Sequence, residues 1–311
     1  RGIVADDGEF CFGYANPIFN SVFGEAAAAD AFLLVGAGGD HHFGSEQRRL
    51  IDPQARVIQI HRDPRQIGVG KIPSVSPAAS HAATLHSLAR ILRNKPASAR
   101  ETWRKHICRK HAEQQAYWTS PARRTDVTGP GLHPVQLCSS LRRHWSHDVS
   151  IIVDVGDFAN WPKAYFPAVL PGHFMDGGAL GNLGGSVPLA IGSCFAQRNS
   201  PVWTFVGDGG FGYHAWDLST AVEHRLPLKI IVGNDRAWKM RLQRKTFDAD
   251  IGCNLPHIRY DRFAKLVGAK GFHVEHANDL DTVVDEFMNA SGTCVLNVEL
   301  AQQTGRPFMA L

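Results

Sequence analysis

Two acidic loops, each directly after an apolar run, constrain the fold of this chain more than any other feature. The first, Gly-Asp-Gly-Gly at 207–210, follows the apolar run 202–206. The second, Asn-Asp at 234–235, follows the apolar run 228–232, and an amphipathic segment separates the two. The pattern predicts a strand, a helix and a second parallel strand. Both loops then lie at the carboxyl ends of their strands, where open parallel sheets bind ligands.

The chemistry of these loops suits a diphosphate held through a magnesium ion. Gly209 and Gly210 allow the backbone to approach a phosphate closely, and N–H groups at the start of the next helix can hold its oxygens. Magnesium prefers oxygen ligands, and Asp208 and Asp235 supply two carboxylates. Taken alone, Gly-Asp-Gly-Gly is more often a tight strand-to-helix turn, so the prediction depends on further elements.

A glycine-dense loop upstream is one such element. Residues 175–188 read Met-Asp-Gly-Gly-Ala-Leu-Gly-Asn-Leu-Gly-Gly-Ser-Val-Pro and lead into the apolar run 189–192. A flexible surface loop is the plain interpretation, but such loops are seldom bracketed so closely by apolar residues.

Together these elements resemble the thiamine diphosphate-dependent enzymes of the acetolactate synthase, 2-hydroxyacyl-CoA lyase, oxalyl-CoA decarboxylase and benzaldehyde lyase group. The family motif runs Gly-Asp-Gly, then an acidic residue with Leu-x-Thr-Ala on a helix, then Leu-Pro-Leu-x-Ile-Ile-Val, then Asn-Asn or Asn-Asp. This chain matches it without a gap from 207 to 235, with Asp217 as the acidic residue. The spacing from Asp208 to Asp235 is the length that the motif expects.

The resemblance implies a role for each residue of the acidic loops. Asp208 and Asp235 would be side-chain ligands of the magnesium ion, and the backbone carbonyl of Ala237 would be a third ligand. Asn234 would fix the loop and contact the diphosphate. Lys239 stands where the family usually has glycine, so its side chain either adds a phosphate contact or points into solvent.

The glycine-dense loop matches the Leu-Gly-x-Met-Gly-x-Gly-x-Pro element of the same family. Leu183 stands at the position of the bulky residue that bends the cofactor into a V, so that the cofactor's amino group can deprotonate its thiazolium ring. The resemblance implies that the Gly181 carbonyl accepts a hydrogen bond from that amino group, and that the Leu183 N–H serves the pyrimidine ring. These two residues are therefore the candidate catalytic residues.

A third strand end adds to the implied site. The apolar segment 150–155 is followed by Gly-Asp-Phe at 156–158, where the family has Asp-Gly-Gly-Asp-Phe beside the diphosphate. Read without the family, Asp154 and Asp157 are ordinary caps of a strand end. The implied cofactor-binding residues are Gly156, Asp157, Phe158, Gly181, Asn182, Leu183, Gly207, Asp208, Gly209, Gly210, Asn234, Asp235, Ala237 and Trp238.

The same signals predict the fold class and the domains. We expect an α/β fold with two Rossmann-like parallel-sheet domains, the second a thiamine diphosphate-binding fold. Residues 1–95 resemble part of the family's central domain, with strand candidates at 31–35 and 57–60. Residues 96–132 read as a linker and 133–311 as the diphosphate-binding domain.

Two departures in the central domain argue against a bound nucleotide there. Gly38 stands where nucleotide-binding members often have arginine, and His61 stands where an aspartate commonly meets the ribose. FAD or ADP is therefore not expected. His173 and His214 lie near the cofactor loops and are candidate proton shuttles, although a plain surface or core histidine is the commoner outcome.

Composition narrows the class of protein. The 311 residues are 44% apolar and 20% charged, which suits roughly two globular domains. There is no apolar run of membrane-spanning length and no signal-peptide pattern, and the six cysteines are scattered as in a reducing compartment, so we expect a cytoplasmic protein. The basic residues between Arg90 and Lys110 lack interleaved aromatics, which favours a solvated helix over a nucleic-acid surface.

The resemblance predicts a magnesium- and thiamine diphosphate-dependent C–C lyase or carboligase, acetolactate synthase-like, acting on a 2-oxo acid or acyl-CoA compound. Nothing in the chain corresponds to the family's amino-terminal pyrimidine-binding domain with its catalytic glutamate. The family's site forms between two subunits, so we expect a homodimer, a homotetramer or a complementing pyrimidine-domain chain. The alternatives are a non-catalytic or fragmentary paralogue that binds cofactor or a partner subunit without turnover and, less favoured, a nucleotide-binding module without thiamine chemistry.

Overall fold

The computed structural model describes residues 3–14, 19–26, 28–37, 52, 54–69, 72–94, 101–119, 127–128, 130–198, 200–239 and 252–304. The chain divides into two compact units, one formed by Ala15–Ala116 and the other by Arg1–Tyr14 together with Tyr117–Pro307.

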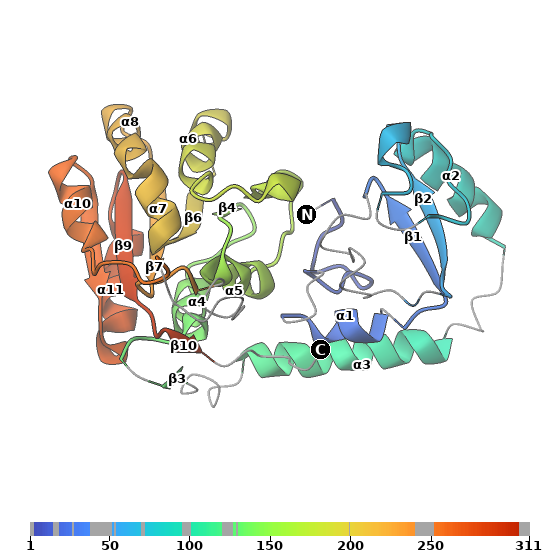
Figure 1. Ribbon diagram of the computed structural model, residues 1–311, viewed down its shortest axis with the longest axis horizontal. Helices are drawn as coiled ribbons and strands as arrows, with labels where there is room; N and C mark the ends of the chain where they lie inside the picture. The colour runs from blue at the N-terminus through green and yellow to red at the C-terminus, as the bar shows by residue number, and fades with distance from the viewer. Residues whose placement is uncertain are drawn as a thin grey trace. The chain divides into compact units, whose positions relative to one another are not determined.

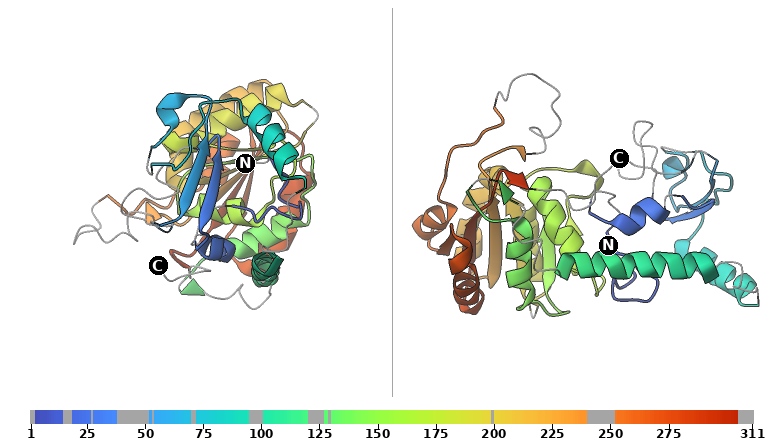
Figure 2. Two further views of the ribbon diagram at one scale, coloured as in Figure 1. Left: turned by 90° about the vertical axis from the view of Figure 1, so that its right-hand side faces the viewer. Right: turned by 90° about the horizontal axis from the view of Figure 1, so that it is seen from below.

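The first unit contains a small parallel sheet. Strands β1 (Ala31–Val35) and β2 (Arg56–Ile60) pair in parallel, with Phe32 opposite Val57, and lie side by side in Figure 2. Both apolar runs predicted as strands therefore form strands. The other elements that begin in this unit are α1 (Ser21–Ala26), η1 (Pro64–Gln66), α2 (His81–Leu92) and α3 (Glu101–Thr119).

Helix α3 occupies much of the range 96–132 that the sequence assigns to a linker. Its basic side chains are paired along the helix: Arg104 contacts Glu101, and Arg109 contacts Glu113 in an (i, i+4) ion pair. Such pairs are typical of a solvated helix surface. Gly38, one of the two positions used against nucleotide binding, lies outside the described residues.

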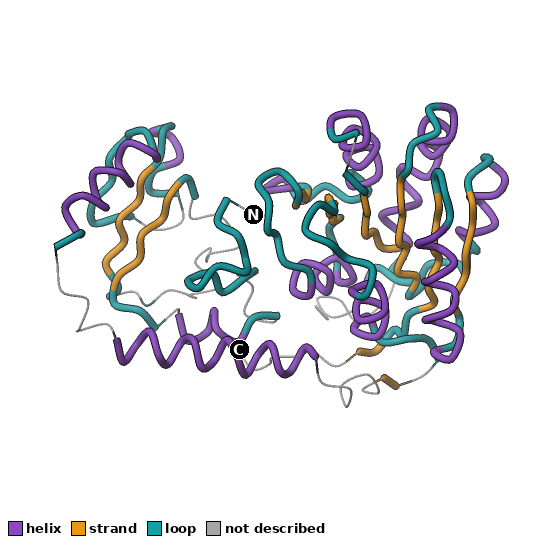
Figure 3. The backbone as a smooth tube through the Cα atoms, turned by 180° about the vertical axis from the view of Figure 1, so that it is seen from behind, coloured by secondary structure: helices purple, strands orange, loops and turns teal. Residues whose placement is uncertain are grey.

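The second unit is built on a six-stranded sheet in the order β5-β4-β6-β7-β9-β8. Strands of this sheet lie side by side between helices in Figures 1 and 3. Every neighbouring pair in it is parallel, with Ile152 opposite Thr204 in the pairing of β4 and β6. Its strands are β4 (Ser150–Val153), β5 (Phe174–Asp176), β6 (Val202–Gly207), β7 (Leu228–Asn234), β8 (Lys270–Val274) and β9 (Cys294–Glu299). Strands β3 (Val127–Thr128) and β10 (Gln303–Thr304) form a separate antiparallel pair.

Helices cover both faces of this sheet (Figure 1). One face carries α6 (Ser186–Ala196), α7 (Asp208–His214), α8 (Leu218–Glu223) and α10 (Tyr260–Leu266), and the other carries α4 (Pro134–Arg142), α5 (Asp157–Tyr165) and α11 (Leu280–Asn289). Short 3-10 turns are η4 (Gly178–Leu180), η5 (Ala215–Asp217) and η6 (Ala277–Asp279). Every residue of β7 and β9 is buried, which is the pattern of a parallel sheet covered on both faces.

The strand order reverses between β4 and β6. These strands are neighbours, yet the chain leaves β4 toward β5 on one side and leaves β6 toward β7 on the other. The helices that follow them, α5 and α7, therefore lie on opposite faces, and the carboxyl ends of two such strands are where open α/β sheets commonly bind ligands. The first predicted acidic loop lies at this position, and the second lies one strand further along.

The amino-terminal residues differ from the predicted domain boundary. Residues 1–14 group with the second unit, whereas the sequence places them in a domain running from 1 to 95. The Asp6 N–H donates to the Ala168 carbonyl, and the Asp6 carboxylate accepts from the Ala168 N–H. All six cysteines are free thiols. Within the described ranges, no helix is both long enough and apolar enough to cross a membrane.

Candidate metal and cofactor site

Three aspartates gather at the carboxyl ends of adjacent strands. Asp157 opens α5 after β4, Asp208 opens α7 after β6, and Asp235 directly follows β7. Because β4, β6 and β7 are consecutive in the sheet, these three carboxylates lie together at the edge formed by the carboxyl ends of the strands. All three side chains are largely buried, although aspartate is almost never buried without a partner.

Asp208 carries the clearest sign of an incomplete site. Its residue is only 3% exposed, and among the described residues its Oδ2 atom has no hydrogen-bond partner. Burial, together with repulsion from Asp235, raises the pKa of Asp208 to about 7, although the N–H groups of Gly209 and Arg236 act in the opposite direction. A buried carboxylate oxygen without a partner is costly, and a cation bound beside it would remove that cost.

The Asp235 carboxylate lies near one positive charge, that of Lys239, and one negative charge, that of Asp157. Burial raises the pKa of Asp235 to about 6, and the charge of Asp157 adds to that rise while Lys239 opposes it. The Lys239 ammonium lies 3.7 Å from the Asp235 carboxylate and 3.5 Å from that of Asp157, and it donates to the Ala301 carbonyl at 3.2 Å. Of the two orientations left open by the sequence, the one into solvent is therefore excluded.

The backbone after Asp235 turns sharply toward the site. Arg236 adopts a left-handed conformation with φ of 57°, which is uncommon for a side chain of its size and marks local strain. The segment is clamped because the Trp238 N–H donates to Cys253 and the Arg236 carbonyl accepts from Leu255. These two hydrogen bonds form the bridge between Ala237 and Asn254, and neither uses the Ala237 carbonyl. That carbonyl therefore remains suitable as a third oxygen ligand for a metal ion. Sequence reasoning missed Arg236, whose only signal is its place directly after Asn-Asp.

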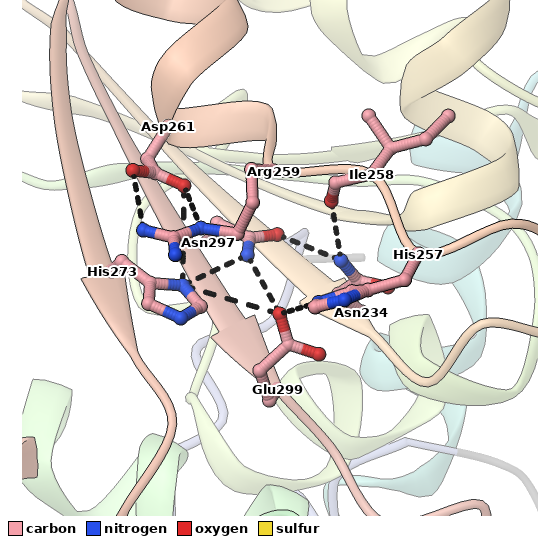
Figure 4. Close-up of polar contacts among 8 residues, drawn as sticks. All are labelled: Asn234, His257, Ile258, Arg259, Asp261, His273, Asn297 and Glu299. Atoms are coloured by element: carbon pink, nitrogen blue, oxygen red, sulfur yellow. Dashed lines mark hydrogen bonds and ion pairs between the residues drawn. The ribbon is translucent and has the colours of Figure 1, made fainter.

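Asn234 is committed to fixing the loop (Figure 4). Its amide Nδ2 donates to the Ile258 carbonyl at 2.9 Å and to Asn297 Oδ1 at 3.1 Å. Asn297 in turn donates to Glu299, which also accepts from His257 at 2.9 Å. This polar cluster ties the end of β7 to β9, and the diphosphate contact implied for Asn234 stays a prediction.

The glycine-dense loop is anchored to the same edge by Asp154. Both oxygens of the buried Asp154 carboxylate accept from the Gly184 N–H, at 3.0 and 2.9 Å. Gly210 has to be glycine for this contact, since a Cβ atom there would lie 2.4 Å from Asp154 Oδ2. Leu183, which directly precedes Gly184 in this loop, is 38% exposed. The sequence indicates only that Asp154 lies at the end of a strand. Its hydrogen bonds to Gly184, which fix the position of the neighbouring Leu183, are not predicted by the sequence.

Two other predicted site residues lie differently from what the motif alone suggests. Gly209 is covered by the indole of Trp238, which would lie 2.4 Å from an added Cβ atom, so packing rather than phosphate access already demands glycine there. Phe158 is buried against Gly233 and Phe205, in the core beneath the site. A direct contact between Phe158 and the cofactor stays a prediction, and the observed contacts of this side chain are packing contacts.

The two candidate proton shuttles separate in space. His173 precedes β5, and its Nδ1 lies 3.2 Å from the Asp148 carbonyl oxygen, so it lies at the amino end of the sheet, away from the site. The expectation that it lies near the cofactor loops is wrong, because proximity in sequence to the loop after β5 does not place it at that end of the strand. His214 ends α7, pairs with Asp217 at 3.0 Å and lies beside Gly184.

We predict that the Asp154 contact stabilises the loop that carries Leu183. Asp154→Leu leaves the buried Gly184 N–H without its acceptor, so the free energy of unfolding should fall by about 1–3 kcal/mol. Asp154→Asn keeps an acceptor oxygen and serves as the matched control, with a much smaller loss. Urea unfolding of the three proteins measures the difference, and equal stability of the leucine and asparagine variants would contradict this role.

The residues present fit a divalent cation that bridges to a phosphate group. Asp208 and Asp235 offer two buried carboxylates, and within the described ranges Asp208 Oδ2 has no hydrogen-bond partner. The two hydrogen bonds of the bridge between Ala237 and Asn254 do not use the Ala237 carbonyl. Across the described part of the chain, no group of three or more His, Cys, Asp or Glu side chains could hold a metal by itself. Such a cation would therefore need further oxygens from a ligand or water, as magnesium commonly does.

Comparison with known proteins finds a family match for part of this chain. Residues 154–298 match the family model described as thiamine pyrophosphate enzyme, C-terminal TPP binding domain. The chain is 25% identical over 316 residues to the acetolactate synthase large subunit of Porphyra purpurea, which covers 97% of this chain and 51% of that protein. It is 30% identical over 165 residues to 2-hydroxyacyl-CoA lyase 2 of Homo sapiens, covering 52% of this chain and 26% of the relative.

A third relative is the acetolactate synthase of Bacillus subtilis (strain 168), 31% identical over 168 residues, which covers 53% of this chain and 30% of that protein. The chain thus spans about half the length, or less, of the relatives it matches. The matched family region contains all three site aspartates and the glycine-dense loop.

Proposed function

Since this chain belongs to the thiamine pyrophosphate enzyme family, we propose that it binds thiamine diphosphate through Mg²⁺ and takes part in making or breaking a C–C bond beside a carbonyl group. The substrate class is a 2-oxo acid or a 2-hydroxyacyl compound, with acetolactate synthase-like chemistry. The observation that carries the proposal is the buried Asp208 oxygen beside Asp235, which has no hydrogen-bond partner in the described part of the chain and lies where the strand order reverses.

Different residues of the chain would bind the metal ion and support the organic part of the cofactor. Asp208, Asp235 and the Ala237 carbonyl would hold the metal, and the polar cluster around Asn234 would keep their loop rigid. Leu183, placed by the Asp154 anchor, would supply an apolar support for the organic part of the cofactor. When bound, thiamine diphosphate supplies the carbanion chemistry itself, so the protein contributes position, charge and exclusion of water.

A second chain is proposed to complete the site. Large apolar side chains are exposed in the glycine-dense loop and on α7 beside it: Leu180 is 92% exposed, and Tyr213, which lies next to Gly184, is 62% exposed. Exposed apolar side chains gathered in one region often mark an interaction surface. The proposed partner is another copy of this chain, in a dimer or tetramer, or a chain with a pyrimidine-binding domain.

The alternative is a paralogue that binds cofactor or a partner subunit without turnover. The observation that favours it is Lys239, because its ammonium already contacts the carboxylate of Asp235, which the proposed metal also needs.

A turnover assay separates the two functions. The chain, alone and mixed with a separately produced pyrimidine-binding domain, is incubated with thiamine diphosphate, Mg²⁺ and either pyruvate or a 2-hydroxyacyl-CoA, and substrate loss is followed. We expect substrate loss that requires both the cofactor and the metal and that disappears with Asp208→Asn. Cofactor binding without turnover of either substrate in any mixture would support the non-catalytic alternative.

A further inference from the structure

Lys239 is a buried cation in the middle of the proposed metal site. The residue is 6% exposed, and its ammonium contacts the carboxylates of Asp157 and Asp235 and the carbonyl of Ala301. Lysine is almost never buried to this degree unless it is paired, so these contacts determine where its charge lies.

The contacts of Lys239 stop short of Asp208. The ammonium contacts the carboxylates of Asp157 and Asp235, whereas Asp208 Oδ2 has no hydrogen-bond partner among the described residues. A divalent cation that satisfies Asp208 would also take Asp235 as a ligand. It would then lie near the ammonium that already contacts Asp235, and two cations at one carboxylate repel each other, strongly so where water is excluded.

We propose that Lys239 is a tethered counter-ion that makes metal binding depend on the diphosphate. Without ligand, the ammonium pairs with Asp235 and opposes a divalent cation. A diphosphate brings several anionic oxygens, so the ammonium transfers to one of them and Asp235 becomes available to the metal. Lysine suits this transfer because its charge is carried on a flexible four-carbon stem. The inference rests on the proposed diphosphate site and adds an order of binding to it.

The consequence is positive coupling between the two ligands. Because coupling is reciprocal, the diphosphate must raise metal affinity by the same factor by which the metal raises diphosphate affinity. Removing the ammonium should strengthen binding of the metal alone and weaken binding of the diphosphate alone. Because no ammonium then has to move from Asp235 to the diphosphate, the diphosphate no longer relieves a repulsion at the metal, and the coupling factor should fall.

The test is a titration of Mn²⁺, a paramagnetic substitute for Mg²⁺, followed by electron paramagnetic resonance with and without inorganic pyrophosphate. We expect Lys239→Met to bind Mn²⁺ alone about 10-fold more tightly than the unmodified chain, within the usual range of coupling effects. Pyrophosphate should then raise the Mn²⁺ affinity of the variant less than it raises that of the unmodified chain. Lys229→Met is the matched control, since Lys229 is also buried but donates to the Phe287 and Ala290 carbonyls at the end of α11.

The outcomes separate this inference from the proposed function. Unchanged or weaker Mn²⁺ binding by a folded Lys239→Met protein, with pyrophosphate-dependent binding intact in the unmodified chain, overturns the counter-ion role alone. Absence of Mn²⁺ binding in both proteins, with and without pyrophosphate, rejects the metal site and the coupling together. If Lys239→Met unfolds without metal, we expect Mn²⁺ to restore its folding, and failure of Mn²⁺ to do so also contradicts the proposal.

Discussion

Asp208→Asn is expected to weaken magnesium-dependent thiamine diphosphate binding by about 100-fold while it stabilises the ligand-free protein. The variant removes a negative charge that would bind the metal ion. In the ligand-free protein the same charge is destabilising, because Asp208 Oδ2 is buried without a hydrogen-bond partner among the described residues. Its amide retains an oxygen for the Gly209 and Arg236 N–H groups. At pH 8 the gain in free energy of unfolding should be about 1–3 kcal/mol.

The pH dependence of that gain has a definite sign. Burial raises the folded-state pKa of Asp208 to about 7 from an ordinary value of 3.8, so the folded state binds this proton more tightly than the unfolded state. The cost of the buried charge is therefore present above pH 7 and decreases as the pH falls from 7 toward 4. The stability difference between Asp208→Asn and the unmodified chain should be largest at pH 8 and small at pH 5, as measured by urea unfolding.

Asp217→Asn provides the control for this prediction. Asp217 belongs to the same sequence motif, yet its half-exposed carboxylate pairs with His214. It is not one of the three aspartates that lie at the carboxyl ends of β4, β6 and β7. Cofactor affinity should change little in this variant. Equal losses of binding for Asp208→Asn and Asp217→Asn would indicate a general disturbance of the fold instead of loss of a metal ligand.

Gly184→Ala is expected to destabilise the second unit by about 2–4 kcal/mol and to abolish cofactor binding. Gly184 has a φ of 80°, and an added Cβ atom would lie 2.7 Å from the Gly210 carbonyl oxygen and 2.8 Å from Tyr213 Cβ. Both contacts are with atoms held by the backbone of α7, so neither can move away cheaply. The loop would shift, and Leu183 would shift with it.

Gly181→Ala separates strain from collision at the same loop. Gly181 also has a left-handed conformation, with φ of 58°, but an added Cβ atom there meets nothing within 4 Å. It should cost only the conformational penalty, about 1–2 kcal/mol. Thermal unfolding and thiamine diphosphate titration of the two variants give the comparison. A Gly184→Ala protein no less stable than Gly181→Ala would contradict the packing described for this loop.

The sheet and its loops could be predicted from the sequence because the signals are local. Continuous apolar runs mark buried parallel strands, and the loops that follow β6 and β7 begin at or next to the residue where each run stops. Strand order then brings Asp208 and Asp235 to one edge, since a strand, helix and strand unit leaves its parallel strands adjacent.

The features that the sequence could not provide depend on distant partners. The direction of Lys239 is set by Asp157 and Ala301, and the bonds that commit Asn234 come from Ile258 and from Asn297 on β9. The position of His173 depends on which end of β5 it occupies. Periodicity predicts which residues are buried but does not identify their contacts across the sheet.

Calorimetric titration of thiamine diphosphate into the purified chain, with Mg²⁺ and again with excess chelator, tests the central claim most directly. The account predicts saturable binding that requires the divalent cation and is lost in Asp208→Asn. Folded protein that binds no thiamine diphosphate with Mg²⁺, alone or in the presence of a pyrimidine-binding domain, would contradict the assignment of a cofactor site to this edge of the sheet.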